Sequence, residues 1–244
     1  MSAPAQPFAI VYQDEHLLVV DKAPGVVVHP ARGHSQDTLS QLLAPLLGGQ
    51  QGAASSPEGQ EGRRGVVHRL DRDTSGLLLL ARDDETLRAL QAELAARRIR
   101  REYLALVEGR VPARTGTIEA PIGRDPRVRT RMAVGGAGAR EARTHFTLER
   151  TLAKSSLLRV QLETGRTHQI RVHMRAIGHP VCGDPEYGTA GSYGLQRQFL
   201  HATRIAFAHP VSGEPLELDS PLPADLQAAL ELADTAGGAG GQVS

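Results

Sequence analysis

One stretch of the sequence sets charged side chains directly before an apolar run: VVHRLDRDTSGLLLLAR, residues 66–82. Asp71 has Arg69 and Arg72 as close sequence neighbours, and the turn-forming residues Thr-Ser-Gly follow. Five consecutive apolar residues, 77–81, predict a strand that is buried on both faces. A polar loop that ends in a rigid strand can hold a carboxylate in place for catalysis. The alternative is an ordinary surface turn, because Asp, Thr, Ser and Gly all favour turns.

A carboxylate in such a loop could act as a nucleophile or as a base. Glycosidic chemistry usually needs two carboxylates. Asp73 is the nearest second one, but two positions apart on a turn they need not face the same site. A serine hydrolase that uses Ser75 and His68 is a rival, although no GxSxG elbow surrounds the serine. No Walker loop or GxGxxG fingerprint is present, which favours chemistry without a cofactor.

A second segment, residues 162–188, reads LETGRTHQIRVHMRAIGHPVCGDPEYG. Gly165 and Thr167 predict a strand-to-helix turn, with a helix over residues 168–177. Three histidines and the single cysteine of the chain lie in this segment: His168, His173, His179 and Cys182. His168 and His173 are five positions apart, about 140° around a helix, so they do not share a face. Since no HExxH or CxxC pattern accompanies them, we predict no metal site.

These segments resemble the signatures of the RluA/RluC/RluD family of pseudouridine synthases. HRLDRDTSGLLLLA is similar to the segment that carries the family's catalytic Asp, and GRTHQIR to a second family segment. REYLALVEG is similar to a Lys/Arg-x-Tyr-x-Ala-x-Val-x-Gly segment, and LHA to a Leu-His-Ala segment. DKAPG departs slightly from the family order Lys-Pro-x-Gly. The resemblance covers residues 8–220, and no S4-type RNA-binding domain is expected before it.

The resemblance implies the isomerisation of specific uridines in structured ribosomal or transfer RNA to pseudouridine, with RNA as the partner and without a small-molecule cofactor. It implies Asp71 as the catalytic carboxylate, Arg171 as its ionic partner and Tyr103 as the aromatic residue that stacks on the target base. The target base must be extruded from the RNA, and Arg69 is a candidate to fill the vacated space. The predicted substrate-binding residues are Arg69, His68, Thr74, Arg166, His168 and Leu200. The same fold could instead serve a non-catalytic RNA-binding protein.

The charge distribution bears on RNA binding. The net charge of the whole chain is only +1, but residues 1–204 hold all 28 basic residues against 21 acidic ones, a net charge of +7. The two densest groups of arginines are Arg97, Arg98, Arg100 and Arg101, and Arg124, Arg127, Arg129 and Arg131. For both groups two alternatives stay open: the arginines contact RNA, or they are simply solvated at the surface. We expect the second group to lie on a loop.

The family resemblance implies an α+β fold with a mixed, mostly antiparallel sheet, flanking helices and a central cleft. We predict one domain over residues 1–234, with a flexible loop at 48–65 and a disordered tail at 235–244. Helices are predicted over residues 37–47, 83–98, 168–177 and 221–234, the first two capped by Asp37 and by Asp83 or Asp84. Strands are predicted over residues 8–12, 17–21, 26–30, 77–81, 103–107, 117–120, 142–149, 157–163 and 200–209.

Composition describes an ordinary globular protein, with 40% hydrophobic and 23% charged residues. The single cysteine excludes a disulfide within the chain. No apolar run approaches the roughly 20 residues that span a bilayer, and the N-terminus lacks the pattern of a signal peptide. We therefore expect a cytoplasmic monomer that does not bind membranes.

Overall fold

The structure is a computed structural model that describes residues 6–28, 38–47, 65–128 and 130–236. The chain divides into two compact units. Unit 1 comprises residues 1–100 and 204–220, and unit 2 comprises residues 101–203 and 221–244. The chain passes between the units three times, so neither is a continuous segment. The single domain expected over residues 1–234 stays a prediction, and most of the expected loop at 48–65 and tail at 235–244 lies outside the described residues.

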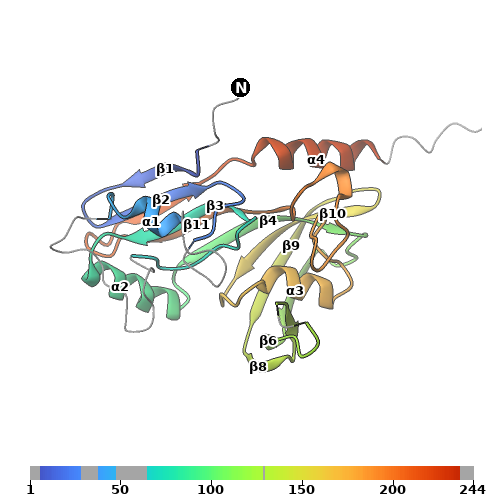
Figure 1. Cartoon of the computed structure of the whole chain (residues 1–244), viewed down its shortest axis with the longest axis horizontal. Coiled ribbons are helices and arrows are strands. Elements are labelled where there is room, and N and C mark those ends of the chain that lie inside the picture. Colours follow the sequence, from blue (N-terminus) through green and yellow to red (C-terminus); the bar gives the residue numbers. More distant parts are fainter. Residues whose placement is uncertain (1–5, 29–37, 48–64, 129, 237–244) are drawn as a thin grey trace, which may run out of the picture. The chain divides into compact units, whose positions relative to one another are not determined.

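Unit 1 is built on a sheet with the strand order β1-β2-β3-β11, in which β12 also pairs with β11 (Figure 1). The strands are β1 (Phe8–Gln13), β2 (Leu17–Lys22), β3 (Ser75–Ala81), β11 (Leu200–Ala208) and β12 (Pro215–Asp219). The pairs β1–β2, β2–β3 and β11–β12 are antiparallel. The predicted strands that match β1, β2, β3 and β11 are confirmed, and β12 was not predicted.

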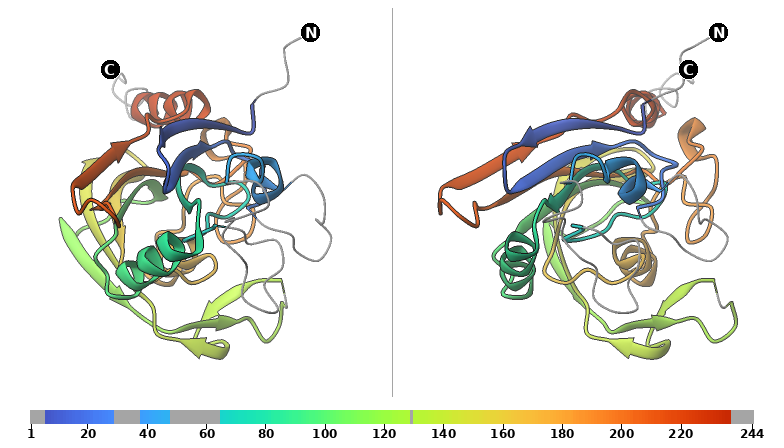
Figure 2. Two further views of the ribbon diagram at one scale, coloured as in Figure 1. Left: turned by 90° about the vertical axis from the view of Figure 1, so that its left-hand side faces the viewer. Right: turned by 60° about the vertical axis from the view of Figure 1, so that its left-hand side comes forward.

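The core of unit 1 forms around β3, all seven residues of which are buried. Alternate residues of a strand point to the same face, and Leu77 and Leu79 join one apolar cluster with Leu87 and Leu90 of α2 (Asp84–Ala95). The helix lies against one face of the sheet (Figure 2). The prediction that the leucine run is a strand buried on both faces is confirmed, which gives the preceding loop a rigid support.

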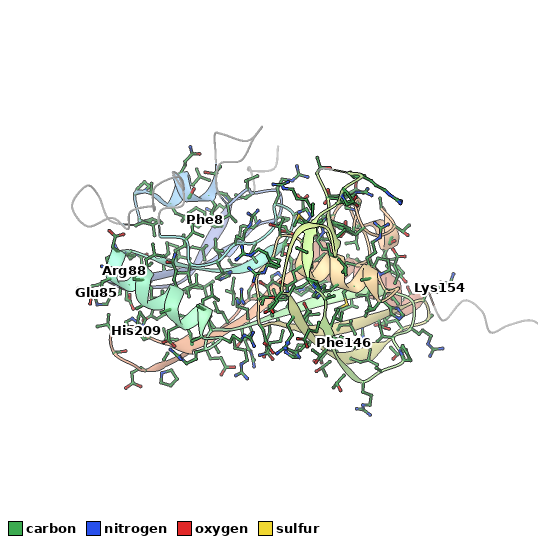
Figure 3. All side chains as sticks on the ribbon, turned by 90° about the horizontal axis from the view of Figure 1, so that it is seen from below. Phe8, Glu85, Arg88, Phe146, Lys154 and His209 are labelled. Atoms are coloured by element: carbon green, nitrogen blue, oxygen red, sulfur yellow. The ribbon has the colours of Figure 1, made fainter. Side chains whose placement is uncertain are left out.

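The helix α2 begins at the predicted cap. Asp83 Oδ1 accepts a hydrogen bond from the backbone amide of Thr86 at 2.7 Å, which satisfies one of the first amides of the helix. The exposed side of α2 carries Glu85 and Arg88 (Figure 3). The helix ends at Ala95, before the predicted end at residue 98, because Arg97 adopts a left-handed backbone with φ 61°.

The short helix α1 (Leu39–Leu43) replaces the predicted helix over residues 37–47. Its cap is Thr38, whereas the predicted cap Asp37 lies outside the described residues. Residues 26–28 form no strand, contrary to the prediction. The carbonyls of Val27 and Val28 instead accept hydrogen bonds from the first amides of the helix, at 2.8 and 3.0 Å. A helix start has unpaired amides that need such acceptors.

Asp14 holds the turn between β1 and β2. Its Oδ1 accepts the backbone amides of His16 and Leu17, both at 2.8 Å, and its Oδ2 accepts the Tyr12 hydroxyl at 2.8 Å and His209 Nε2 at 2.9 Å. Burial raises the pKa of Asp14, but these hydrogen bonds outweigh burial and lower the pKa to about 2. The ionised carboxylate therefore ties the first hairpin to the turn after β11.

We expect this carboxylate to stabilise the fold above pH 4 and to lose that effect on acidification. The unfolded chain binds the proton near pH 3.8, whereas the folded chain binds it only near pH 2, so stability falls as pH drops through this interval. Because the side chain is 26% exposed, we expect a contribution of only about 1 kcal/mol. Chemical denaturation of wild type and Asp14→Asn at pH 7 and pH 2.5 measures it. An equal loss of stability in both proteins on acidification would show that Asp14 is not responsible.

Unit 2 contains a second run of strands in the order β11-β4-β10-β9-β5. They include β4 (Arg100–Glu108), β5 (Thr115–Glu119), β9 (Arg143–Thr151) and β10 (Ser155–Leu162), and the first residues of β11 belong to this unit. The pairs β4–β10, β10–β9 and β9–β5 are antiparallel. Tyr103, Ala105 and Val107 are buried on β4, as their alternation predicted. These four strands confirm the corresponding predictions.

The described residues of unit 2 form three helical segments: α3 (Gln169–Ala176), the short 3-10 helix η1 (Ser192–Gly194) and α4 (Ala224–Thr235). The two α-helices match predictions within a few residues. None of the helices in the described residues is long and apolar enough to cross a bilayer. The few helices and the mostly antiparallel strands confirm the predicted α+β class. The central cleft stays a prediction.

The arginine-rich stretch predicted as a loop is flanked by the strands of a small three-stranded sheet of order β7-β6-β8. Its strands are β6 (Ile122–Arg124), β7 (Met132–Val134) and β8 (Ala137–Arg140). The loop prediction is right for Arg127 and Arg131, which lie between β6 and β7, and wrong for Arg124, the last residue of β6, because strands this short show no clear alternation. At Gly123 the backbone comes so close to the carbonyl of Gly136 that a Cβ would collide with it. A glycine there adds no side chain from which a strand could be predicted. Arg129 lies outside the described residues.

Candidate active site

The loop that carries Asp71 is held at both ends by β3. Before the loop, the Val67 amide donates to the Leu79 carbonyl at 3.3 Å, and after it the chain enters the strand directly. The loop itself closes as a turn in which the Thr74 amide donates to the Asp71 carbonyl at 3.1 Å. Asp71 is partly exposed, so its carboxylate sits on a rigid support while remaining accessible to a substrate.

Lys22 anchors this loop from β2. Its side chain is fully buried, and its Nζ donates to the carbonyls of Ala23 at 2.8 Å, Val26 at 3.0 Å and Arg72 at 2.8 Å. A buried ammonium needs such hydrogen bonds to offset the loss of water. The bond to Arg72 fixes the backbone immediately after Asp71. Sequence reasoning had noted Lys22 only as part of a motif.

The predicted neighbours of Asp71 differ in their surroundings. Arg69 is exposed. Arg72 pairs with Asp73, its Nη2 lying 2.8 Å from Asp73 Oδ2, so the second carboxylate of the loop has a cation of its own. The imidazole of His68 is buried, and its Nε2 accepts the Leu79 amide at 3.2 Å. Thr74 is also buried. For His68 and Thr74 the contacts described are structural, and their predicted contact with RNA stays a prediction.

Three arginines of the first group are exposed, and the fourth, Arg101, is buried. Arg97 and Arg100 are exposed, while Arg98 forms an ion pair with Glu93 in which Nη2 lies 2.6 Å from Oε1. Arg101 is buried, with its Nη2 donating to the Leu162 carbonyl at 3.3 Å, and burial lowers its pKa. The alternation of β4 explains this split, because it turns Arg101 inward.

Tyr103 lies two positions further along β4, opposite Val160 of β10. Its side chain is only 4% exposed, so the ring is almost completely buried. Leu200, one of the predicted substrate-binding residues, is likewise buried at the start of β11. Both residues lie in unit 2, but their predicted contact with a target base stays a prediction.

Arg171 stands on α3 inside a buried network of charges. Its Nε donates to Asp184 Oδ2 at 2.7 Å, and its Nη2 donates to Asp184 Oδ1 at 2.9 Å and to Glu186 Oε2 at 2.7 Å. Its guanidinium carbon lies 4.9 Å from the centre of the Tyr187 ring, which adds a cation–π contact. Arg171 is only 4% exposed, so it does not lie on the solvent face of the helix.

Of the two further predicted residues at the start of α3, His168 contacts this network and Arg166 has partners outside it. His168 has a left-handed backbone with φ 56°, and its Nδ1 lies 2.9 Å from the hydroxyl of Tyr187. Arg166 donates its amide to Gln169 Oε1 at 2.9 Å and its Nε to the Glu141 carbonyl at 2.9 Å. Burial, followed by the nearby charge of Arg140, lowers the pKa of Arg166.

The histidines considered for a metal have other partners. His173 is fully buried between Thr144 Oγ1 and the Ala120 carbonyl, both at 2.9 Å, and burial lowers its pKa. His179 Nδ1 lies 2.8 Å from the Glu108 carbonyl. Among the residues that the structure describes, no group of His, Cys, Asp and Glu has the arrangement of a metal site.

Asp184 is the second residue that sequence reasoning missed, although it lies in the quoted GDPEYG segment. Its carboxylate is completely buried. Burial raises its pKa, but Arg171 and the amides of Glu186 and Tyr187 outweigh burial, so the pKa lies below the ordinary value for Asp. The only signal in the sequence was an Asp within a Gly- and Pro-rich turn.

Comparison with known proteins bears on the family. A family model described as RNA pseudouridylate synthase matches residues 16–176, more than half of the chain. An "Uncharacterized RNA pseudouridine synthase" of Chloroflexus aurantiacus is 55% identical over 214 residues, which cover 86% of this chain and 64% of that protein. A "Ribosomal large subunit pseudouridine synthase D" of Nitrosomonas europaea is 45% identical over 240 residues, covering 94% of this chain and 66% of that protein. The chain thus spans just under two thirds of the length of these two relatives.

A solved structure of a protein with a pseudouridylate synthase title has a similar fold. The structure titled "Human RNA Pseudouridylate Synthase Domain Containing 1" is similar with a TM-score of 0.68 and 28% identity, covering 90% of this chain and 86% of that chain. The resemblance noted in the HRLD and GRTHQIR segments is therefore confirmed. This chain belongs to the RNA pseudouridylate synthase family.

Proposed function

We propose that the protein isomerises specific uridines in ribosomal RNA to pseudouridine. The observation that carries the proposal is the HRLD segment, which sets Asp71 on a loop fixed by β3 and Lys22 in a chain of this family. Ribosomal RNA is the preferred substrate because relatives of 41–45% identity are named for the large ribosomal subunit. Since bacterial ribosomal RNA lies in the cytoplasm, we propose that the protein acts there, and as a monomer.

The reaction rearranges bonds within one nucleotide. The bond between ring nitrogen 1 and the ribose breaks, the freed uracil turns, and a bond forms between ring carbon 5 and the ribose. The proton on carbon 5 is lost and nitrogen 1 gains one, so no oxidant, reductant or energy source is consumed. An ionised Asp71 can attack the nucleotide or remove a ribose proton. Family resemblance assigns Arg171 to the charge of the reacting carboxylate and Tyr103 to the face of the base.

Loss of the proton on carbon 5 supplies a direct assay. RNA transcribed with uridine tritiated at carbon 5 should release tritium to water when incubated with the purified protein, without release of free uracil. Release of free uracil would indicate hydrolysis instead of isomerisation. RNA binding without tritium release, on ribosomal and transfer RNA alike, would favour the non-catalytic RNA-binding alternative. Mapping pseudouridines in cells with and without the gene then identifies the uridine.

We predict that Arg69→Ala slows the modification of a structured RNA far more than that of a short unstructured one. Extruding a base from a duplex costs a few kcal/mol, and less when the base is already unpaired. A guanidinium that fills the gap should therefore matter by about tenfold or more for the structured RNA and by about threefold or less for the unstructured one. Single-turnover rates on both substrates measure the difference.

Arg88→Ala is the matched control for this prediction, since Arg88 is another exposed arginine of unit 1 and lies on α2 (Figure 3). It should leave both rates unchanged. If Arg69→Ala slowed both substrates to the same degree, Arg69 would have no role in extrusion. A contact with phosphate would then be the better explanation.

A further inference from the structure

The buried carboxylate of Asp184 has no part in the reaction described so far. It accepts two parallel hydrogen bonds from Nε and Nη2 of Arg171, at 2.7 and 2.9 Å. Glu186 takes the other proton of Nη2 at 2.7 Å. A guanidinium has five N–H protons, and these bonds occupy the three on Nε and Nη2. Any hydrogen bond from Arg171 to the reacting groups must therefore come from Nη1.

Asp184 is itself held by the backbone, independently of Arg171. Its Oδ1 accepts the amide of Glu186 at 2.9 Å and that of Tyr187 at 3.1 Å. The preceding Gly183 has φ 74°, and a side chain there would collide with the carbonyl of Arg197. The turn is therefore fixed by backbone conformation, and it presents the carboxylate to Arg171 in one orientation.

We propose that Asp184, with the assistance of Glu186, is a positioning residue that fixes the guanidinium of Arg171 in one orientation, with Nη1 as the donor for the reaction. This inference rests on the proposed function, in which Arg171 takes part in the reaction. A planar guanidinium that donates two hydrogen bonds from one edge to a fixed carboxylate is held in one orientation. The buried network thus converts a flexible side chain on α3 into a rigid donor.

A second Arg–Asp ion pair of the same unit serves as a comparison for the pair of Arg171 and Asp184. Arg197 contacts Asp225 through the same two nitrogens, with Nε–Oδ2 and Nη2–Oδ1 distances of 2.7 and 3.0 Å. The side chain of Asp225 is 49% exposed, whereas that of Asp184 is fully buried. Asp225→Asn is therefore a control that removes a bidentate Arg–Asp pair with an exposed carboxylate from the same unit.

The first test compares single-turnover rates at saturating RNA. Asp184→Asn keeps the shape of the residue but offers an amide to Arg171 in place of one carboxylate oxygen. We expect the rate to fall about a hundredfold, as a misplaced catalytic group does, with the Kd for RNA changed by less than about threefold. Asp225→Asn should leave the rate within about twofold of wild type. A normal rate in Asp184→Asn would overturn the positioning role.

The second test is a double-mutant cycle with Arg171→Met. If Asp184 acts only through Arg171, adding Asp184→Asn to Arg171→Met should change the rate by less than about threefold. The double variant should also have a higher Tm than Arg171→Met alone, because it no longer buries an unpaired carboxylate. A further large drop in rate in the double variant would show that Asp184 acts by another route and would overturn the proposal.

The proposed function and the positioning role of Asp184 would be overturned by different results. A folded wild-type protein that releases no tritium from any RNA would overturn the proposed function, and the role of Asp184 with it. An active wild type whose rate is insensitive to Asp184→Asn would overturn only the positioning role. A Tm of Asp184→Asn within a few degrees of that of Asp225→Asn, measured beside the rates, establishes that a lost rate is not lost folding.

Discussion

Replacing Asp71 with Asn is expected to abolish pseudouridine formation while the affinity for RNA stays within about tenfold of wild type. Asparagine has nearly the shape of aspartate, but it is neither a nucleophile nor a base at this step. Asp71 lies partly exposed on its loop, and the substitution keeps the volume of its side chain. Phosphate contacts supply most of the affinity of proteins for RNA and do not involve a carboxylate. Tritium release and filter binding on the same preparation measure both quantities.

Asp73→Asn is the control for Asp71→Asn. Asp73 is two residues away on the same turn, and its carboxylate already pairs with Arg72. We expect this variant to keep most of its activity. Substantial turnover by Asp71→Asn would show that the catalytic group lies elsewhere, and a complete loss of activity in Asp73→Asn would point to a two-carboxylate mechanism.

The second large effect concerns Lys22. Lys22→Met keeps most of the side-chain volume but leaves three carbonyls, those of Ala23, Val26 and Arg72, without this donor. An unsatisfied buried polar group costs about 1–3 kcal/mol, so we expect the free energy of unfolding to fall by about 3 kcal/mol or more. The rate of pseudouridine formation should fall as well, because the loop of Asp71 loses its tie to β2. Urea denaturation and tritium release measure the two effects.

Lys154 offers the control, since it is the only other lysine of the chain. It is exposed and lies in the turn between β9 and β10 (Figure 3). Lys154→Met should change neither stability nor rate. If Lys22→Met behaved like Lys154→Met, the ammonium of Lys22 would have no role in holding the loop.

Local sequence patterns predicted the elements that their own residues determine. The leucine run of β3 is apolar throughout and is buried throughout. Asp83 accepts the amide three residues ahead, which is a short-range interaction that a capping residue reveals by its type. The end of α2 was missed because the left-handed backbone of Arg97 has no signature in an arginine. Strands of three or four residues in β6, β7 and β8 are too short for a period to be recognised.

In the candidate site, too, some residues were predicted from the sequence and others were found only in the structure. The family resemblance picked out Asp71, Tyr103 and Arg171 from contiguous motifs, and the family itself is confirmed. The residues that hold the loop and the guanidinium were not found. Lys22 contacts a carbonyl 50 residues away, and Asp184 contacts Arg171 13 residues earlier in the chain. A single sequence carries no sign of such pairings, because either partner alone reads as an ordinary charged residue.

The strand order of unit 1 has a consequence for synthesis on the ribosome. β3 ends at residue 81, but its neighbour β11 begins at residue 200, about 120 residues later. At usual translation speeds the interval is on the order of ten seconds. Until Ile205 and Phe207 have been translated, the apolar cluster around Leu77 and Leu79 is incomplete, and the edge of β3 opposite β2 is paired only by the short bridge to Val66. The nascent chain therefore needs protection from aggregation for longer than a protein whose sheet forms from consecutive strands.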